Sequence, residues 1–134
     1  MRLTVLLFAF SVLLLASTCR DDAAKSPEMK VLFRTWLHAH EEDQGDVLVY
    51  RPNTYSFKPS RGRTGFAFDP NGLFTQYDIA PTDGMEGRRG QWTAENDHTL
   101  RISLQDQHEP DYRLEIVSLT PELLQVRRLP VVSK

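Results

Sequence analysis

The sequence is almost free of cysteine: of its 134 residues, only Cys19 is one. An intramolecular disulfide is therefore excluded, and the fold must be stabilised by side-chain packing and strand pairing. No charge of one sign dominates, since 16 Lys and Arg face 18 Asp and Glu and the formal net charge is −2. This balance gives no electrostatic support for binding nucleic acid, and we expect no nucleic-acid partner.

The sequence also lacks the signatures of common catalytic chemistry. No Gly-x-Ser-x-Gly is present, so the nucleophile elbow of serine hydrolases is excluded. Gly84, Gly87 and Gly90 do not have the spacing of a phosphate-binding loop between a strand and a helix. Residues 69–74, Asp-Pro-Asn-Gly-Leu-Phe, begin like a calcium loop but continue with apolar residues, so they predict a turn. The sequence thus predicts a protein that is not an enzyme and that carries no cofactor.

Only one long apolar run occurs, at residues 3–16, after Met1 and Arg2. It is shorter than the roughly 20 residues of a bilayer-spanning helix and has the form of a secretory signal peptide. The run ends in Ala16-Ser17-Thr18-Cys19, which resembles the lipobox of bacterial lipoproteins. In that family a peptidase cuts before the cysteine, and the thiol is diacylated. The alternatives are a retained N-terminal anchor helix, a cysteine removed with the signal, and a free thiol.

This resemblance implies a signal peptide over residues 1–18, a lipid on Cys19 and a polar tether over residues 19–30. Each buried CH2 of an acyl chain contributes about 0.8 kcal/mol, so such a lipid would hold the protein firmly on a membrane. We therefore expect an exported protein of the bacterial cell envelope, most simply an outer-membrane lipoprotein. Without the lipid, it would be secreted or periplasmic.

Residues 31–130 have the pattern of a β domain. Aromatic and β-branched runs are interrupted by Gly, Pro, Asn and Asp at intervals of about 8–12 residues. Leu100, Ile102 and Leu104 alternate with polar residues, as in a strand with one buried face, and no segment shows helical periodicity. The two prolines of residues 52–60 exclude a regular central strand there. The expected strands are residues 33–39, 46–51, 65–68, 73–79, 88–93, 99–104, 112–119 and 123–128.

Strands in meander order leave two open edges unless they close on each other, and a barrel removes those edges. The sequence therefore predicts an all-β fold, a small antiparallel up-and-down barrel of about eight strands. The order of features also resembles the lipocalin-like (calycin) proteins that bacteria export. The resemblance is carried by Leu-Phe-Arg-Thr-Trp at residues 32–36, the Asn-Gly hairpin in residues 68–74, Gly-Gln-Trp at residues 90–92 and the closing segment 114–124. The family usually has a glycine two residues before the first tryptophan, where this chain has Arg34.

The resemblance implies a barrel with an interior, and an eight-stranded barrel can be filled by its own side chains or hold one small ligand. The main hypothesis is a membrane-anchored, non-enzymatic binding protein for a small apolar or amphipathic molecule. The candidate ligand-binding residues are the aromatics Trp36, Tyr50, Phe66, Phe74, Tyr77 and Trp92. The alternative is an interaction or structural lipoprotein of the envelope, with a filled barrel that contacts a partner protein through its charged end.

That charged end is predicted from an acidic segment, Glu41–Asp43, and a basic segment, Arg51–Arg63, which a hairpin of the first two strands would bring together. Its members are His38, His40, Glu41, Glu42, Arg51, Arg61 and Arg63. We interpret the cluster as a surface ion-pair network of little energetic worth, with an anion site as the alternative because guanidinium groups bind carboxylate and phosphate.

A third hypothesis is a metal-dependent hydrolase. On a strand, the side chains of His38 and His40 would lie on the same face, about 6–7 Å apart. Together with Glu41 they would form a set of zinc ligands. Two histidines rarely suffice for such a site, so we expect no metal.

Overall fold

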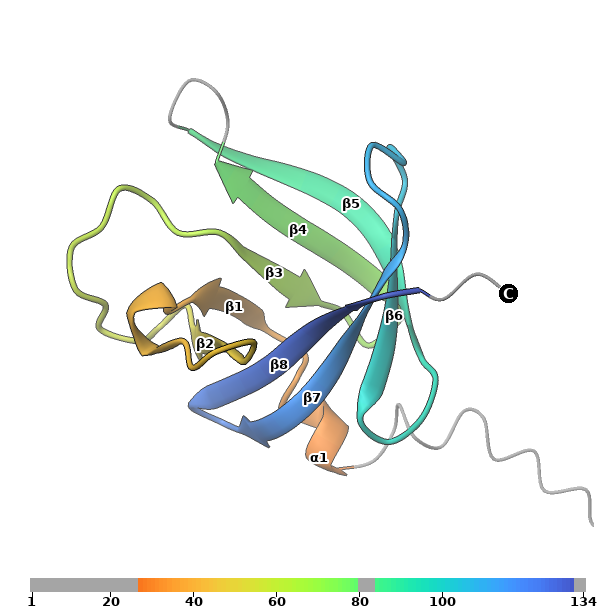
Figure 1. The fold of residues 1–134 in the computed structure, drawn as a ribbon, viewed down its shortest axis with the longest axis horizontal. Coiled ribbons are helices and arrows are strands. Elements are labelled where there is room, and N and C mark those ends of the chain that lie inside the picture. Colours follow the sequence, from red (N-terminus) through yellow and green to blue (C-terminus); the bar gives the residue numbers. More distant parts are fainter. Residues whose placement is uncertain (1–26, 80–83, 132–134) are drawn as a thin grey trace, which may run out of the picture.

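Eight antiparallel strands close into a barrel in the computed structural model, which describes residues 27–79 and 84–131 (Figure 1). The strands are β1 (Thr35–His38), β2 (Leu48–Pro52), β3 (Gly65–Phe68), β4 (Leu73–Ile79), β5 (Met85–Ala94), β6 (Thr99–Leu104), β7 (Tyr112–Thr120) and β8 (Leu123–Pro130). A short helix, α1 (Pro27–Lys30), precedes them, and a 3-10 turn, η2 (His40–Glu42), joins β1 to β2. The predicted all-β barrel is confirmed. The signal peptide, Cys19 and the tether up to residue 26 lie outside the described residues.

The strand order departs at one point from a simple meander. Going round the barrel, the order is β1-β2-β8-β7-β6-β5-β4-β3, so β1 lies between β2 and β3. The connection from β2 to β3, residues 53–64, therefore passes across β1. Twelve extended residues reach up to about 40 Å, so this segment is long enough for the crossing. Pro59 lacks the N–H that a central strand needs, which favours a loop here.

The expected strands are all present, and their bounds differ most near glycine. Residues 65–68, 73–79 and 99–104 form strands as expected, whereas β5 begins at Met85, three residues before the expected start at residue 88. There Ile79 pairs with Met85, and Tyr77 pairs with Gly87. A Cβ on Gly87 would lie 3.5 Å from the ring of Tyr77, so that ring covers the glycine from the same face of the sheet. This cross-strand cover compensates for the side chain that glycine lacks.

One end of the barrel is closed by the segment that precedes β1. Met29 of α1 and Leu32 are buried in the core, and the indole N–H of Trp36 donates to the carbonyl of Leu32 at 3.0 Å. Arg34 stands where the resemblance would place a glycine. Its guanidinium lies over the Trp36 ring, 5.6 Å from the centroid, and donates to the carbonyl of Pro121.

Residues 27–30 were predicted to belong to the tether, and this is corrected. They form α1, and Met29 and Leu32, three positions apart, both reach the core. The ordered domain therefore begins before residue 31, although four residues are too few to show a helical period in the sequence.

The rest of the interior is largely filled. Alternate residues of the strands point inward, and the most deeply buried side chains are Leu32, Trp36, Phe74, Leu100, Ile102 and Leu124. The ring of Phe68 contacts those of Phe74 and Trp92, with centroids 5.2 and 6.1 Å away. Inside the barrel, space for a ligand is left towards the opposite, open end.

Gly90 marks a close approach between β5 and β6, and this gives a testable prediction. A Cβ at this position would lie 2.4 Å from the carbonyl oxygen of Ser103, a backbone atom that cannot move aside by changing rotamer. We expect Gly90→Ala to lower the free energy of unfolding by about 2 kcal/mol, as overpacking does, measured by urea denaturation. Gly84→Ala is the control, because a Cβ there meets no atom within 4 Å. Equal effects of the two substitutions would contradict the close approach.

Candidate ligand site at the open end

The open end is formed by the connections opposite α1. The turn η2, the end of the β2–β3 connection, the adjoining ends of β4 and β5 and the β6–β7 loop all lie there, as the antiparallel registers require (Figure 1). Along β4, Phe74 is followed at two-residue intervals by Gln76 and Asp78, so the inward face changes from apolar to polar towards this end. The same change occurs on β8, where Arg128 follows Val126.

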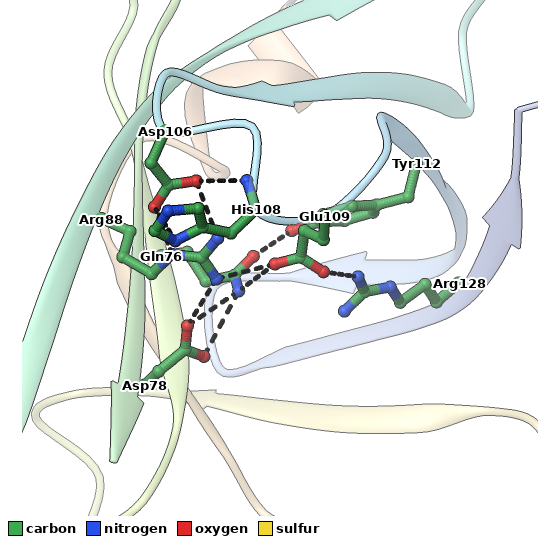
Figure 2. Close-up of polar contacts among 8 residues, drawn as sticks. All are labelled: Gln76, Asp78, Arg88, Asp106, His108, Glu109, Tyr112 and Arg128. Atoms are coloured by element: carbon green, nitrogen blue, oxygen red, sulfur yellow. Dashed lines mark hydrogen bonds and ion pairs between the residues drawn. The ribbon is translucent and has the colours of Figure 1, made fainter. Parts of the chain in front are cut away.

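A polar network centred on Arg88 crosses this end of the barrel (Figure 2). Nε and Nη2 of Arg88 donate to the two carboxylate oxygens of Asp106 at 2.7 and 2.9 Å. Nη1 donates to Asp78 at 3.0 Å and to Glu109 at 2.8 Å. The Arg88 side chain is 16% exposed, and its carboxylate partners are 26–34% exposed, so solvent reaches the network from the carboxylate side.

The network has a buried hydrogen bond beneath it, between β7 and β4. The hydroxyl of Tyr112 donates to Oε1 of Gln76 at 2.6 Å, and both residues are buried. Nε2 of Gln76 in turn donates to Asp78 and Glu109, each at 3.0 Å. The amide of Gln76 therefore links the buried tyrosine to the carboxylates at the surface.

A second arginine lies on the neighbouring side of the network. The Arg128 guanidinium packs over the ring of Tyr112, 3.8 Å from the centroid, and Nη2 donates to Glu109. Burial acts to raise the pKa of Glu109, but hydrogen bonds from Arg128, Gln76 and Arg88 outweigh it and lower the pKa. The hydrogen bond from Arg88 likewise lowers the pKa of Asp106. Both carboxylates therefore stay ionised at neutral pH.

Below the network lies a cavity of about 110 Å³. Its apolar part is formed by Leu48, Phe66 and Leu114, together with the rings of Tyr50 and Tyr112. Its polar lining includes Gln76, Asp78 and Arg128. An apolar cavity of about 150 Å³ holds a benzene molecule, so this one has room for a small apolar group.

Tyr50, on β2, lines the cavity, and its hydroxyl has no hydrogen-bond partner among residues 27–79 and 84–131. It is only 8% exposed, and its ring stacks between those of His38 and Phe66, with centroids 5.0 and 4.3 Å away. Burial and the nearby carboxylate of Asp43 raise its pKa to about 12. Its hydroxyl is therefore neutral at physiological pH and able both to donate and to accept a hydrogen bond.

His38 connects this cavity to the charged segments of the first hairpin. Its Nε2 lies 2.9 Å from Oδ2 of Asp43, and the Oδ1 atom of Asp43 accepts from the backbone N–H of Val49 at 2.8 Å. Asp43 thus fixes both the imidazole and the start of β2, and the imidazole in turn supports the ring of Tyr50.

The predicted pairing of acidic and basic segments at one barrel end is what the structure shows. Arg51 pairs with Glu42 at 2.6 Å, and Arg63 pairs with Glu41 at 2.8 Å. The hydrogen bonds from Arg63 lower the pKa of Glu41 to about 2. Arg61 is exposed and joins no ion pair within the described part of the chain. The paired arginines are saturated by carboxylates, which leaves little of the predicted anion site.

The zinc geometry considered for His38, His40 and Glu41 is not formed. The strand ends at His38, and His40 begins η2, so the two imidazoles do not share a strand face, although their ring centroids lie 6.1 Å apart in an edge-to-face contact. His40 is exposed and lies 3.6 Å from Glu41, whereas His38 contacts Asp43. No group of three or more His, Cys, Asp or Glu side chains among the described residues is placed to hold a metal ion.

The six aromatic candidates fall into three groups. Tyr50 and Phe66 line the cavity. Trp36, Phe74 and Trp92 are buried in the core towards the closed end. Tyr77 alternates with the inward Gln76 and Asp78, and although it borders the cavity, its ring packs over Gly87 on the outer face. Of the six candidates, Tyr50, Phe66 and Tyr77 therefore border this cavity.

The polar residues of the open end were not among the site residues predicted from the sequence. They are Gln76, Asp78, Arg88, Asp106, Glu109, Tyr112 and Arg128. A signal for some of them was present, because Gln76 and Asp78 continue the two-residue period of Phe74, and Arg88 lies four residues before Trp92. Polar residues at inward positions of a barrel strand indicate its open end.

Comparison of the chain with protein families, with curated proteins and with solved structures finds no match. In residues 27–79 and 84–131, no helix combines the length and the apolar character needed to cross a bilayer.

Proposed function

We propose that this protein is a non-enzymatic binding module that takes a small amphipathic molecule at the open end of its barrel. The observation that carries the proposal is the cavity of about 110 Å³, whose wall contains Tyr50, a residue whose hydroxyl has no hydrogen-bond partner in the described chain. The ring of Tyr50 is held in place by burial, so its hydroxyl is available to form a hydrogen bond with a ligand in the cavity.

The size of the cavity narrows the ligand class. Phe74, Trp92 and Ile102 fill the lower barrel, so a long acyl chain or a large ring has no space there. The apolar wall formed by Leu48, Phe66 and Leu114 accepts a short alkyl chain or a small ring. The polar rim requires that the other end of the ligand carry hydrogen-bonding or charged atoms.

We also propose that the barrel works on a membrane, held by a lipid on Cys19. The support is the signal-like run of residues 3–16 and its lipobox-like end. A ligand site at one end of a tethered barrel would capture small molecules close to the membrane surface.

The alternative is an envelope protein whose barrel serves only as a scaffold for a partner. The filled lower interior favours it. The internal pairing of Arg51 with Glu42 and of Arg63 with Glu41 disfavours it, because these charges are already engaged within the chain.

The proposal is tested with a neutral probe, 1-butanol, whose alkyl chain suits the cavity. We expect NMR shifts at Tyr50, Phe66 and Leu114 that saturate with a millimolar dissociation constant. This is the affinity expected for a ligand that has only a few non-hydrogen atoms. Leu48→Phe, at the cavity wall, should weaken binding at least about tenfold, because the larger ring occupies the site. Leu73→Phe makes the same change at an exposed position and should leave binding unaltered. Absence of saturable shifts at the cavity residues would refute the proposal.

A further inference from the structure

The charges at the open end do not balance. The network around Arg88 contains three carboxylates, of Asp78, Asp106 and Glu109, and two guanidinium groups, of Arg88 and Arg128. Asp43 adds a fourth carboxylate beside the cavity, and its partner His38 carries a charge only when protonated. The rim of the cavity is therefore negative, and it presents that charge to whatever occupies the cavity.

Both guanidinium groups already pair with carboxylates. Every nitrogen of Arg88 donates to Asp78, Asp106 or Glu109. Arg128 donates to Glu109 through Nη2 and packs over the ring of Tyr112. An anionic ligand at Arg128 would meet the neighbouring carboxylate of Glu109, whereas a cation adds to a site with negative charge in excess.

The cavity itself has the composition that suits an ammonium group. The rings of Tyr50, Phe66 and Tyr112 supply aromatic surface, and aromatic faces attract cations. Asp78 supplies a carboxylate on the same wall. The Tyr50 hydroxyl, with no partner in the part of the chain that the structure describes, supplies an acceptor for an N–H.

We infer that the ligand is a small primary amine, bound as its ammonium ion, with a short apolar tail. The tail lies against Leu48, Phe66 and Leu114, and the ammonium group lies between the carboxylate of Asp78 and the hydroxyl of Tyr50. This inference rests on the proposed binding function and adds the charge of the headgroup that the site selects.

The test compares three probes with the same alkyl chain: n-butylammonium, 1-butanol and butanoate. Each is titrated into the full chain at pH 7 and low salt, and the dissociation constants are taken from NMR shifts at the cavity residues. We expect n-butylammonium to bind about tenfold more tightly than butanoate, because a charge-assisted hydrogen bond forms only with the cation. The preference should shrink as salt is raised, because ions screen the partly exposed rim.

Two variants test which side chains cause the preference for n-butylammonium. Asp78→Asn should reduce the preference for n-butylammonium over 1-butanol about fivefold, since the side chain keeps its shape and loses its charge. Tyr50→Phe should reduce n-butylammonium affinity about threefold to tenfold, as expected for the loss of one hydrogen bond. Tyr55→Phe is the matched control, because Tyr55 is exposed and lies outside the cavity. A thermal melt of each variant shows that it is folded.

The outcomes separate this inference from the function on which it rests. If 1-butanol binds at the cavity but n-butylammonium binds no better than butanoate, the ammonium inference is wrong and the binding function stands. If butanoate binds most tightly, Arg128 and not Asp78 sets the selectivity, which also overturns the inference. If no probe shifts the cavity residues, both proposals fail. Selectivity that survives both Asp78→Asn and Tyr50→Phe would place the ammonium group elsewhere and contradict the assignment.

Discussion

Trp36→Ala is expected to lower the free energy of unfolding by about 3–5 kcal/mol, the range for removing a large aromatic side chain from a core. Trp36 has no exposed surface, and its indole N–H bonds to the carbonyl of Leu32, so the substitution creates a cavity and frees a buried acceptor. It also removes the surface on which Arg34 packs. Urea denaturation followed by far-UV circular dichroism measures the change.

The control for this substitution is Leu73→Ala. Leu73 is 55% exposed, so the loss of its side chain should change stability by less than about 0.5 kcal/mol. If Trp36→Ala proved as mild as the control, the segment before β1 would not close the barrel. The assignment of opposite closed and open ends would then be wrong.

Arg88→Met is expected to lower the free energy of unfolding by about 3 kcal/mol at pH 7, because it leaves three neighbouring carboxylates without their shared cation. This value is at the low end of the range for buried ion pairs, since solvent reaches the side chains of Asp78, Asp106 and Glu109 and screens their repulsion. Arg101→Met is the control: Arg101 forms an exposed pair with Asp111, and its loss should cost less than about 1 kcal/mol.

The difference between wild type and Arg88→Met should shrink as the pH falls. In the wild type, Asp106 and Glu109 have lowered pKa values, so their contribution to stability is present above about pH 4–5 and is lost as they protonate at lower pH. In Arg88→Met, protonation instead relieves repulsion among the carboxylates. Chemical denaturation at pH 7 and at pH 3 measures the difference in the free energy of unfolding between wild type and Arg88→Met at each pH. A difference that is constant with pH would show that Arg88 acts through packing alone.

Much of the fold could be predicted because each strand has a local residue pattern. Leu100, Ile102 and Leu104 alternate with polar residues, which predicts β6, and Asn71-Gly72 predicts the β3–β4 turn. Neither prediction depends on residues that are distant in the sequence. The position of β1 between β2 and β3 could not be predicted from such local patterns. It depends on which strands pair after a long connection, and the alternation of residues along a strand does not indicate its pairing partner.

The site was predicted less well than the fold. The aromatic candidates were chosen by residue type, and most of them fill the core, because large apolar side chains are used for packing first. The ion pairs of Glu41 and Glu42 with arginines were predictable from the hairpin. The network around Arg88 joins residues from β4, β5, the β6–β7 loop and β8, and only closure of the barrel brings these together.

Native mass spectrometry of the full-length protein, extracted gently from the membranes of its own host, tests the binding function most directly. The expected spectrum contains an acylated chain beginning at Cys19 with one small molecule attached non-covalently. The same preparation of Leu48→Phe should lack that molecule, because the cavity is filled. An acylated chain with nothing bound in either preparation would contradict a binding function and leave a filled barrel that serves a protein partner.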